Sequence, residues 1–366
     1  MKFTTKKQDM VKELQILQGI VEKRNTMPIL ANILIKTREN EVELTGTDLE
    51  VGLKTKLPAK VEIPGSITVS GKKTFEIVRS LREDIDITFA VENLNTLIIT
   101  SGASEFRLVG LPEEDYPPVV TSQFEKEIRF PLDIFQKMID RVFFAIAQEQ
   151  RYYLNGALMV LSANQIELVS TDGYRLAYVK APLEPLNIEG EIRCIISKKT
   201  LNEIRKFDDS IVDFDLDESN LFFQVGQRIL ISRIIEGKFP NYEAVIPTEN
   251  PFKLKVSREE LLESIRRVSL LSSDRTKGVK FKFSSDKIIL FSSNPEIGEA
   301  KDEVKVEYEG DELEVGFNAQ YILDFLTISQ SEMIKMELKD SKNAALLQPD
   351  DDTGLEYLYV LMPMNI

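Results

Sequence analysis

The stretch RYYLNGALMVLSANQIELVSTDGYRLAYVK, residues 151–180, decides how the chain is interpreted. Two strand-like runs flank the turn Ser170-Thr171-Asp172-Gly173, in which every residue is small or polar, as a reversal between strands requires. Tyr174, Arg175 and Leu176 follow at the predicted start of the second strand. A rigid aromatic ring, a guanidinium and an aliphatic side chain are typical anchors in a shallow groove that grips a peptide. An ordinary β-hairpin has the same local pattern, so the remaining sequence must distinguish the two.

The pattern around this stretch occurs three times. Apolar residues at helical spacing predict a first helix in each third, at Met10, Leu14, Leu17 and Val21, at Phe135, Ile139, Val142 and Ile146, and at Leu261, Ile265 and Val268. Strand-like runs around a short polar turn follow each helix, with the turns at 46–48, 170–172 and 292–294. A second helix is predicted near Phe75, Leu201 and Tyr321, and each third closes with Pro117, Pro240 or Pro363.

A repeat of roughly 120 residues is longer than a solenoid unit and has the size of a domain. We therefore predict three similar domains, 1–124, 125–249 and 250–366, with polar linkers at the boundaries. Runs such as 41–44 and 279–283 alternate polar and apolar residues, which predicts antiparallel sheets with one wet face and one face under helices. The predicted fold class is α+β, with two helices on antiparallel sheets in each domain.

The composition excludes several classes of function. None of the 366 residues is His, which removes Ser-His-Asp and Cys-His catalysis and every His-based metal site. The single Cys194 lies in an apolar run, which predicts a buried, unreactive thiol. No apolar run has the length of a membrane span and the N-terminus lacks a signal core, so a cytoplasmic location is expected.

The charge of the chain is unevenly distributed. A formal net charge of −14 argues against a protein that wraps nucleic acid with its whole surface. The predicted helical segments, such as 72–82 and 197–206, are nevertheless basic, while the strands and turns are strongly acidic. Such a chain repels DNA from its acidic body and attracts DNA to its helical face. Helix propensity alone is a competing explanation for Lys and Arg in these segments.

Two motifs that resemble ligand sites are better explained without a ligand. Gly71-Lys72-Lys73-Thr74 matches the end of a phosphate-binding loop, but Ser66 stands where the first glycine is required. Asp350-Asp351-Asp352 places three adjacent carboxylates on a strand, where they cannot all face one metal. The acidic run 213–218 is interpreted as a solvated strand end and turn. We expect no metal, no cofactor and no catalytic residue.

Seven motifs, in this order, resemble those of the bacterial DNA polymerase III β sliding clamps. They are TMPILANILI (26–35), LTGTDLE (44–50), LPEEDYP (111–117), RYYLNG (151–156), TDGYRLA (171–177), GKFPNY (237–242) and MPM (362–364). The resemblance extends over the whole chain. It implies a DNA clamp fold of three domains, two chains closed head to tail into a ring, and helices that line a central hole for duplex DNA.

The resemblance also implies a function. Sliding clamps are processivity factors of DNA replication; they have no catalytic activity and hold the polymerase of the DNA polymerase III holoenzyme on its template. The partners it implies are double-stranded DNA bound without sequence specificity, a second copy of the chain, a replicative polymerase subunit, an ATP-dependent clamp loader and other proteins with clamp-binding peptide motifs. A membrane is not among them.

In this family, partner peptides dock in a pocket between the second and third domains. The resemblance assigns to this pocket Leu154, Thr171, Gly173, Tyr174, Arg175, Leu176, Pro240, Val245, Tyr321, Val360, Met362, Pro363 and Met364. Tyr174 stands where many members have His, and Ala244 where many have Arg. We expect these departures to change partner preference while the pocket itself is kept.

The residues expected to contact DNA are mostly long, flexible cations. They are Lys23, Arg24, Lys72, Lys73, Gln148, Arg151, Tyr152, Tyr153, Lys198 and Lys199. Contacts of this kind to phosphates are sequence-independent and individually weak, which lets a clamp slip from site to site.

The seam between two copies is expected to involve Phe106 and Leu108 of the first domain. Their predicted partners are Leu270 and Leu271 of the third domain. Edge strands would be capped by the partner chain at this seam. Ala103 and Glu105 replace arginines that the family often has here, so we expect a different set of ion pairs.

Two other classes of protein remain open from the residues alone. A metal-dependent nuclease would need carboxylates from different elements that converge on a metal, and the sequence offers no such set. An acidic adaptor that binds peptides but does not encircle DNA would keep the pocket and lack the ring. Formation of a ring would argue against both.

Overall fold

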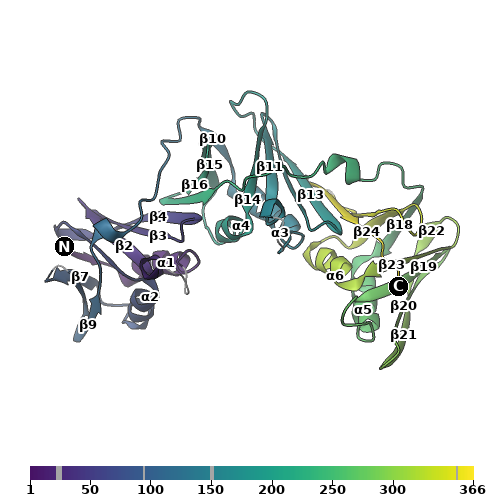
Figure 1. The fold of residues 1–366 in the computed structure, drawn as a ribbon, viewed down its shortest axis with the longest axis horizontal. Helices are drawn as coiled ribbons and strands as arrows, with labels where there is room; N and C mark the ends of the chain where they lie inside the picture. Colours follow the sequence, from purple (N-terminus) through teal and green to yellow (C-terminus); the bar gives the residue numbers. More distant parts are fainter. Residues whose placement is uncertain (22–26, 94, 149–151, 352) are drawn as a thin grey trace. The chain divides into compact units, whose positions relative to one another are not determined.

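The computed structural model describes residues 1–21, 27–93, 95–148, 152–351 and 353–366. These residues form two compact units (Figure 1). Unit 1 comprises residues 1–133 and 199–234, and unit 2 comprises residues 134–198 and 235–366. The division cuts through the second predicted repeat, because the two sheets of that repeat belong to different units.

The six predicted helices are confirmed in the described residues, although the first and the third end before the predicted helix residues Val21 and Ile146. They are α1 (Lys7–Leu17), α2 (Gly71–Ser80), α3 (Leu132–Phe143), α4 (Lys198–Ile204), α5 (Arg258–Ser269) and α6 (Ala319–Ile328). Several begin with the side-chain caps that their sequences provide: Ser70 Oγ accepts from Lys73 N–H in α2, and Ser257 Oγ accepts from Glu260 N–H in α5. Short 3₁₀ helices follow at η1 (Pro28–Ala31), η2 (Glu113–Asp115), η3 (Tyr152–Leu154) and η4 (Glu243–Val245).

Unit 1 contains two antiparallel sheets. The larger has the order β10-β15-β16-β17-β4-β3-β2-β6 and the smaller the order β5-β1-β7-β8-β9. The strand bounds are β1 Lys2–Thr5, β2 Asn32–Arg38, β3 Glu41–Thr47, β4 Val51–Pro58, β5 Lys60–Ile63, β6 Ser66–Ser70, β7 Ile87–Glu92, β8 Thr96–Ser101, β9 Ser104–Val109, β10 Ile128–Pro131, β15 Ile211–Leu216, β16 Asn220–Val225 and β17 Arg228–Arg233.

Unit 2 is built in the same way. Its larger sheet has the order β14-β11-β12-β13-β26-β25-β24-β18-β22, and its smaller sheet the order β21-β20-β19-β23. The strand bounds are β11 Gly156–Ser162, β12 Gln165–Thr171, β13 Arg175–Pro182, β14 Ile192–Ser197, β18 Phe252–Ser257, β19 Gly278–Ser284, β20 Lys287–Asn294, β21 Gly298–Lys305, β22 Glu307–Glu309, β23 Leu313–Asn318, β24 Met333–Leu338, β25 Ala345–Pro349 and β26 Glu356–Leu361.

Each large sheet joins strands from two successive repeats. In unit 1, β4 of the first repeat pairs with β17 of the second, and Gly52 lies opposite Ile231. In unit 2, β13 of the second repeat pairs with β26 of the third, and Leu176 lies opposite Val360. The repeats are therefore fused through continuous backbone hydrogen bonding within each unit.

The predicted turns are displaced toward the C-terminus. Residues 46 and 47 belong to β3, 170 and 171 to β12, and 292 to 294 to β20, so each reversal follows the predicted segment. Tyr174 consequently lies in the turn and β13 begins at Arg175. In the first two turns, a threonine hydroxyl donates across the reversal: Thr171 Oγ1 donates to Arg175 O at 2.6 Å, and Thr47 Oγ1 donates to Val51 O at 3.1 Å.

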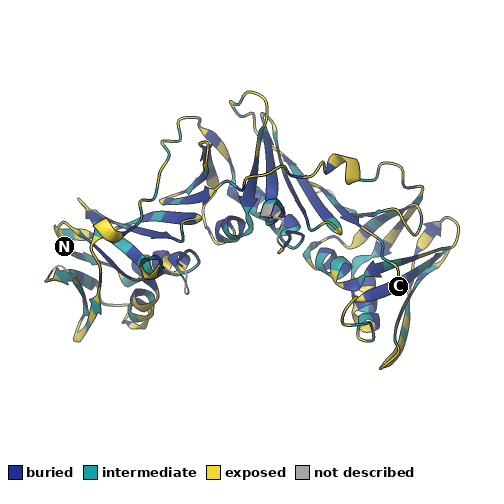
Figure 2. Cartoon of the chain, in the orientation of Figure 1, coloured by how far each residue is buried: buried dark blue, intermediate teal, exposed yellow. Residues whose placement is uncertain are grey.

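Apolar residues on alternate strand positions and on the inner faces of the helices form the cores (Figure 2). The burial of β2 alternates along the strand, as the sequence predicts, with Ile33 and Ile35 fully buried. The predicted helix residues Met10, Leu14 and Leu17 are also fully buried. None of the helices in the described part of the chain has both the length and the apolar character needed to cross a membrane.

A buried ion network fastens α1 to β17 in unit 1. Arg228 donates to both carboxylate oxygens of Glu13, at 2.7 and 2.9 Å, and to Asp208 at 2.8 Å. Thr55 Oγ1 donates to the same Glu13 carboxylate at 2.6 Å. Only 7% of the Arg228 side chain and 10% of the Glu13 side chain are exposed. A bidentate pair of this kind fixes the geometry between the first repeat and the part of the second repeat that unit 1 contains.

Candidate functional site

The turn around Asp172 and Gly173 in unit 2 is held by hydrogen bonds from its own side chains. Asp172 Oδ1 accepts hydrogen bonds from the N–H groups of Tyr174 and Arg175, at 3.0 and 3.1 Å. Gly173 N–H donates to Thr171 Oγ1 at 3.1 Å. Gly173 has φ of 91°, a conformation that favours glycine. The sequence S-T-D-G thus specifies the turn through its own side chains.

Arg175 is held in place from several sides. Its Nη1 donates to Asp324 Oδ2 in α6 at 2.6 Å, its Nε to Asp172 Oδ2 at 2.9 Å, and its Nη2 to Phe144 O at 2.7 Å. The guanidinium also lies over the Tyr321 ring, 4.3 Å from its centroid. Burial opposes the charge on Arg175, but Tyr359 and Asp324 raise its pKa above the ordinary value. The Arg175 side chain is 10% exposed, and these contacts fix its orientation.

Three predicted apolar pocket residues belong to one buried cluster. Leu154, Leu176 and Val360 are each at most 3% exposed and pack in the same core group. The other members include Tyr178, Phe239, Tyr242 and Leu346. Tyr178 and Tyr242 stack with ring centroids 5.9 Å apart. These three residues therefore belong to one buried apolar layer, here called the floor, and Leu176 and Val360 each lie two residues from the exposed Tyr174 and Met362.

Two predicted residues next to the floor, here called the rim, are exposed. Tyr174 is 59% exposed, and Met362 is 41% exposed. They are adjacent, because the N–H of Met362 donates to the carbonyl of Tyr174 at 2.9 Å. A flexible methionine beside an exposed ring offers an adaptable apolar contact for a ligand.

The remaining predicted pocket residues are distributed around this floor and rim. Thr171 is buried and Tyr321 and Pro363 are half-buried, whereas Pro240 and Val245 are exposed. Met364 follows two residues after Met362; its N–H donates to Gly316 O in β23 at 2.9 Å, and it lines a hollow of about 170 Å³.

Sequence reasoning missed the residues that position Arg175. Asp324 and the Phe144 carbonyl are remote from Arg175 in the chain, and no local pattern connects them. Leu346 and Tyr242, which complete the apolar floor, were also missed. The internal repeat was the one available signal, since it places the strand containing Val360 against the strand containing Leu176.

The structure places the predicted DNA-contact residues in different environments. Lys72 and Lys73, at the start of α2, are exposed and pair with Glu76 at 3.8 and 2.7 Å. Lys198 lies over the Phe143 ring, 5.0 Å from its centroid. Lys199 is held within unit 1, where its ammonium donates to the Ile20 carbonyl at 2.9 Å and pairs with Asp48.

Among the other predicted DNA-contact residues, Tyr153 packs against the buried cluster that contains Leu154. Gln148 is exposed and Tyr153 is half-buried. Lys23, Arg24 and Arg151, together with the side chain of Tyr152, lie outside the described residues. Burial and the nearby charge of Arg175 lower the pKa of Lys198.

The predicted seam residues lie at sheet edges or beside them. Phe106 and Leu108 are half-buried on β9, which pairs with β8 along one side. In unit 2, Leu270 is 77% exposed at the end of α5, and Leu271 is half-buried. Large apolar side chains beside an open strand edge are suited to a partner chain.

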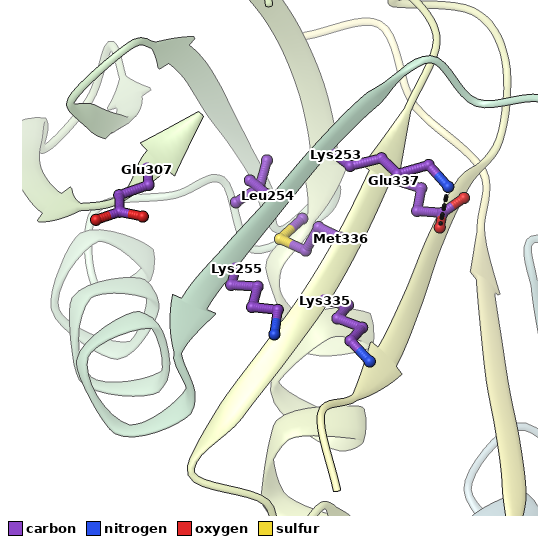
Figure 3. Close-up of a pocket in the computed structure, with 7 residues that line it drawn as sticks. All are labelled: Lys253, Leu254, Lys255, Glu307, Lys335, Met336 and Glu337. Carbon is purple, nitrogen blue, oxygen red and sulfur yellow. Dashed lines mark ion pairs between the residues drawn. The ribbon is translucent and has the colours of Figure 1, made fainter. Parts of the chain in front are cut away.

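Other motifs have structural explanations. Cys194 is buried, and burial raises the pKa of its thiol to about 12. Asp350 pairs with Lys335 at 2.7 Å and with Lys255, and Asp352 lies outside the described residues. These lysines line a hollow of about 440 Å³ on β18 and β24 (Figure 3). No cluster of metal-ligating side chains occurs among the residues that the structure describes.

Comparison with known proteins identifies the family. The family models for the N-terminal, central and C-terminal domains of the DNA polymerase III beta subunit match residues 1–121, 129–241 and 243–365. The beta sliding clamp of Pseudomonas putida is 35% identical, with 100% of both chains covered. The chain thus matches this relative over its whole length.

Solved structures agree. The DNA polymerase III subunit beta of Pseudomonas aeruginosa superposes with a TM-score of 0.93 at 33% identity, and a sliding clamp of Bartonella birtlesii bound to griselimycin with a TM-score of 0.95 at 33% identity. Each comparison covers 100% of both chains. With three tandem α+β domains that match the three family models in order, this chain belongs to the DNA polymerase III beta subunit family, the bacterial beta sliding clamps.

Proposed function

We propose that two copies of this chain close head to tail into a ring around duplex DNA and tether the replicative polymerase to its template. The observation that carries this proposal is the pattern of strand edges. In both units, the third strand after the first helix of one repeat pairs with the last strand of the following repeat. These pairs are β4 with β17 and β13 with β26. Two strands at equivalent positions have no such partner repeat within the chain: β21 of the third repeat corresponds to β4 and β13, and β9 of the first repeat corresponds to β17 and β26. In the described residues, each of them lies at a sheet edge.

A second copy completes this pattern. If β21 of one copy pairs with β9 of the other, the four-stranded and five-stranded sheets combine into a sheet like the two large ones. The second copy would pair its own β21 with β9 of the first copy in the same way. Two such head-to-tail contacts close a ring and leave neither strand edge open. The apolar residues Phe106 and Leu270 lie beside these edges and would be covered in the same step.

The proposed role is mechanical rather than catalytic. Retention on DNA follows from ring closure, and the basic helical segments need only weak, sequence-independent phosphate contacts. Lys72 and Lys73 are exposed and suited to this role. The predicted contacts of Lys23, Arg24 and Arg151 belong to the same proposal. We place this action in the bacterial cytoplasm, on the nucleoid during replication.

Partners would dock on the surface of unit 2 formed by Tyr174, Leu176, Val360 and Met362. Its apolar floor and adaptable methionine rim suit a short peptide motif. The replicative polymerase subunit, the clamp loader and other clamp-binding proteins would share it. A relative that binds griselimycin supports a ligand-binding surface in this family. The domain boundaries at 124/125 and 249/250 remain part of this proposal.

Loading on circular DNA tests the proposal. The protein is loaded onto a nicked plasmid with a clamp loader and ATP, separated from free protein by gel filtration, and the plasmid is then linearised. A ring stays on the circle and slides off the cut ends. An adaptor that binds peptides without encircling DNA would show no retention on either form.

A further inference from the structure

Unit 1 contains a hollow of about 400 Å³ beside the junction of β4 and β17. Its lining includes Leu49 and Glu50 from the turn after β3, Val120 from the segment before β10, and Ile231 and Arg233 from β17. Leu49 is 46% exposed and Val120 is 50% exposed, so apolar side chains remain accessible around it.

This hollow occupies the position in the first pair of repeats that the Tyr174–Met362 surface occupies in the second pair. Arg233 N–H donates to Glu50 O at 2.9 Å, and Met362 N–H donates to Tyr174 O at the same distance. Arg233 therefore stands at the place of Met362, and Glu50 at the place of Tyr174.

The strand register gives the same correspondence independently. Gly52 is opposite Ile231, as Leu176 is opposite Val360. Thr47, opposite Gly52, also closes its turn with the same hydroxyl hydrogen bond that Thr171 makes. The backbone that shapes the two surfaces is therefore the same, and the side chains differ.

The differences change the chemistry of the surface. Gly52 lacks the side chain that Leu176 contributes, and Val119 Cγ1 lies 3.0 Å from the position of an added Cβ, so Val119 supplies the apolar wall instead. At the rim, a guanidinium replaces the methionine. Within the described residues, the exposed Arg233 side chain has no ion pair or side-chain hydrogen bond, and it is available for an anionic group.

The hollow of Figure 3 lacks this combination. The lysines of the hollow in Figure 3 already pair with protein carboxylates, Lys253 with Glu337 at 3.1 Å and Lys255 and Lys335 with Asp350. An additional anion would have to displace these partners. The hollow of unit 1 joins open apolar walls to an unpaired cation.

We propose that this hollow is a second peptide-docking site, which binds an extended partner segment carrying an aliphatic side chain next to a carboxylate. The aliphatic group would lie against Leu49, Val119 and Ile231, and the carboxylate would pair with Arg233. Because β4 and β17 are already paired with each other, recognition would occur through side chains rather than by strand addition. This inference rests on the proposed function, because it assumes that the corresponding surface of unit 2 binds peptides. The preference for an aliphatic group beside a carboxylate follows from the residues that line the hollow of unit 1.

The test uses full-length protein and ligand-observed NMR. Saturation transfer is measured to the leucine methyl groups of two synthetic peptides, Gly-Ser-Leu-Asp-Ser-Gly and Gly-Ser-Leu-Lys-Ser-Gly. The parent protein is Met362→Glu, which places a charge in the floor-and-rim surface of unit 2 and removes its contribution. Arg233→Glu and Arg233→Lys are then introduced into this parent, and thermal unfolding confirms that each variant is folded.

We expect the Asp peptide to bind the parent and to bind the Arg233→Glu variant at least about threefold more weakly, as loss of a rim ion pair predicts. The Lys peptide should show the reverse preference, and Arg233→Lys should retain binding of the Asp peptide. Equal binding by the parent and Arg233→Glu, or no binding by the parent, would overturn the inference. If the wild type binds the Asp peptide and the Met362→Glu parent does not, the peptide binds only at the surface of unit 2. That result would overturn the inference and leave the proposed function intact.

Discussion

The Asp324 carboxylate in α6 accepts a hydrogen bond from Arg175 Nη1 at 2.6 Å and fixes the guanidinium beside the proposed peptide-docking surface. The same carboxylate accepts from Gln320 Nε2 at 2.8 Å. Asp324 thus connects the second helix of the third repeat to the turn of the second repeat within unit 2.

We expect Asp324→Ala to lower the free energy of unfolding of unit 2 by about 1–3 kcal/mol, because it leaves a largely buried guanidinium short of one charged acceptor. Peptide affinity should fall as well. Asp324→Asn retains one acceptor oxygen and should lie between wild type and Asp324→Ala. Urea unfolding followed by circular dichroism measures the change, since the chain has no Trp. No shift in the unfolding midpoint of Asp324→Ala would contradict this role.

The Glu13–Arg228 pair in unit 1 allows a second prediction. Arg228→Ala leaves the Glu13 carboxylate buried without its partner and should cost about 3–5 kcal/mol of stability. Lys12→Ala is the matched control, because the Lys12–Asp208 pair is more than half exposed and its loss should change stability by less than about 1 kcal/mol. Similar unfolding midpoints for the two variants would show that the buried network does not hold the repeats together.

Acid should weaken unit 1 partly through Asp208. Hydrogen bonds from Lys12 and Arg228 lower the pKa of this carboxyl to about 2. Since the folded-state pKa lies below the unfolded value, the stabilisation is present above about pH 4 and is lost as the pH falls through 2. The difference in unfolding midpoint between wild type and Asp208→Asn should therefore be constant near pH 5 and shrink toward pH 2. A difference that grows on acidification would have the wrong sign.

The internal repeat predicts a specific ion pair at the proposed seam. Arg107 is the fourth residue of β9, as Ile231 is of β17, and Glu299 is the second residue of β21, as Gly52 is of β4. Gly52 and Ile231 are opposite each other, so Arg107 should lie opposite Glu299 of the second copy.

Charge reversal tests this pair. In the wild-type chain, Arg107 pairs with Glu92 and Glu105. Arg107→Glu replaces this cation with a third carboxylate and should weaken the dimer about tenfold. The double variant Arg107→Glu, Glu299→Arg should recover much of the loss. Sedimentation equilibrium gives the dimer dissociation constant for each. A double variant no stronger than the single one would place Glu299 away from Arg107.

The exposed lysines of α2 should account for part of the salt dependence of DNA binding. Lys72→Ala with Lys73→Ala should reduce the slope of log binding constant against log salt by about 2, roughly 0.9 per lost phosphate contact. Lys199→Met is the matched control, because its ammonium already binds Ile20 O and Asp48. It should lower stability and leave the slope unchanged. A slope that responds to Lys199 instead would mean that this side chain leaves Asp48 on DNA.

The sequence predicted the local elements well and the long-range contacts poorly. Helical spacing located all six helices, and alternation identified strands such as β3 and β19, because both patterns are properties of neighbouring residues. The ends of β3 and β12 were misplaced because alternation does not record the hydroxyls of Thr47 and Thr171, which donate across the reversals.

The functional contacts depend on residues far apart in the chain. Nothing near Arg175 indicates Asp324, and nothing near Lys199 indicates Asp48, since each pair forms only when separate elements pack together. The pairing of β4 with β17 was likewise beyond local pattern. Only the threefold repeat carries such information, because a contact observed in one pair of repeats predicts its counterpart in the next.

Retention by ring closure is tested most directly with a covalently closed ring. Arg107→Cys with Glu299→Cys should form a disulfide across each seam, since opposite residues of antiparallel strands have a suitable Cα separation, and native Cys194 is buried and does not compete. After loading on a nicked circular plasmid and oxidation, the cross-linked dimer should remain on the circle in 1% SDS and be released by linearising the plasmid. Release of the cross-linked dimer from intact circles by SDS would contradict the account.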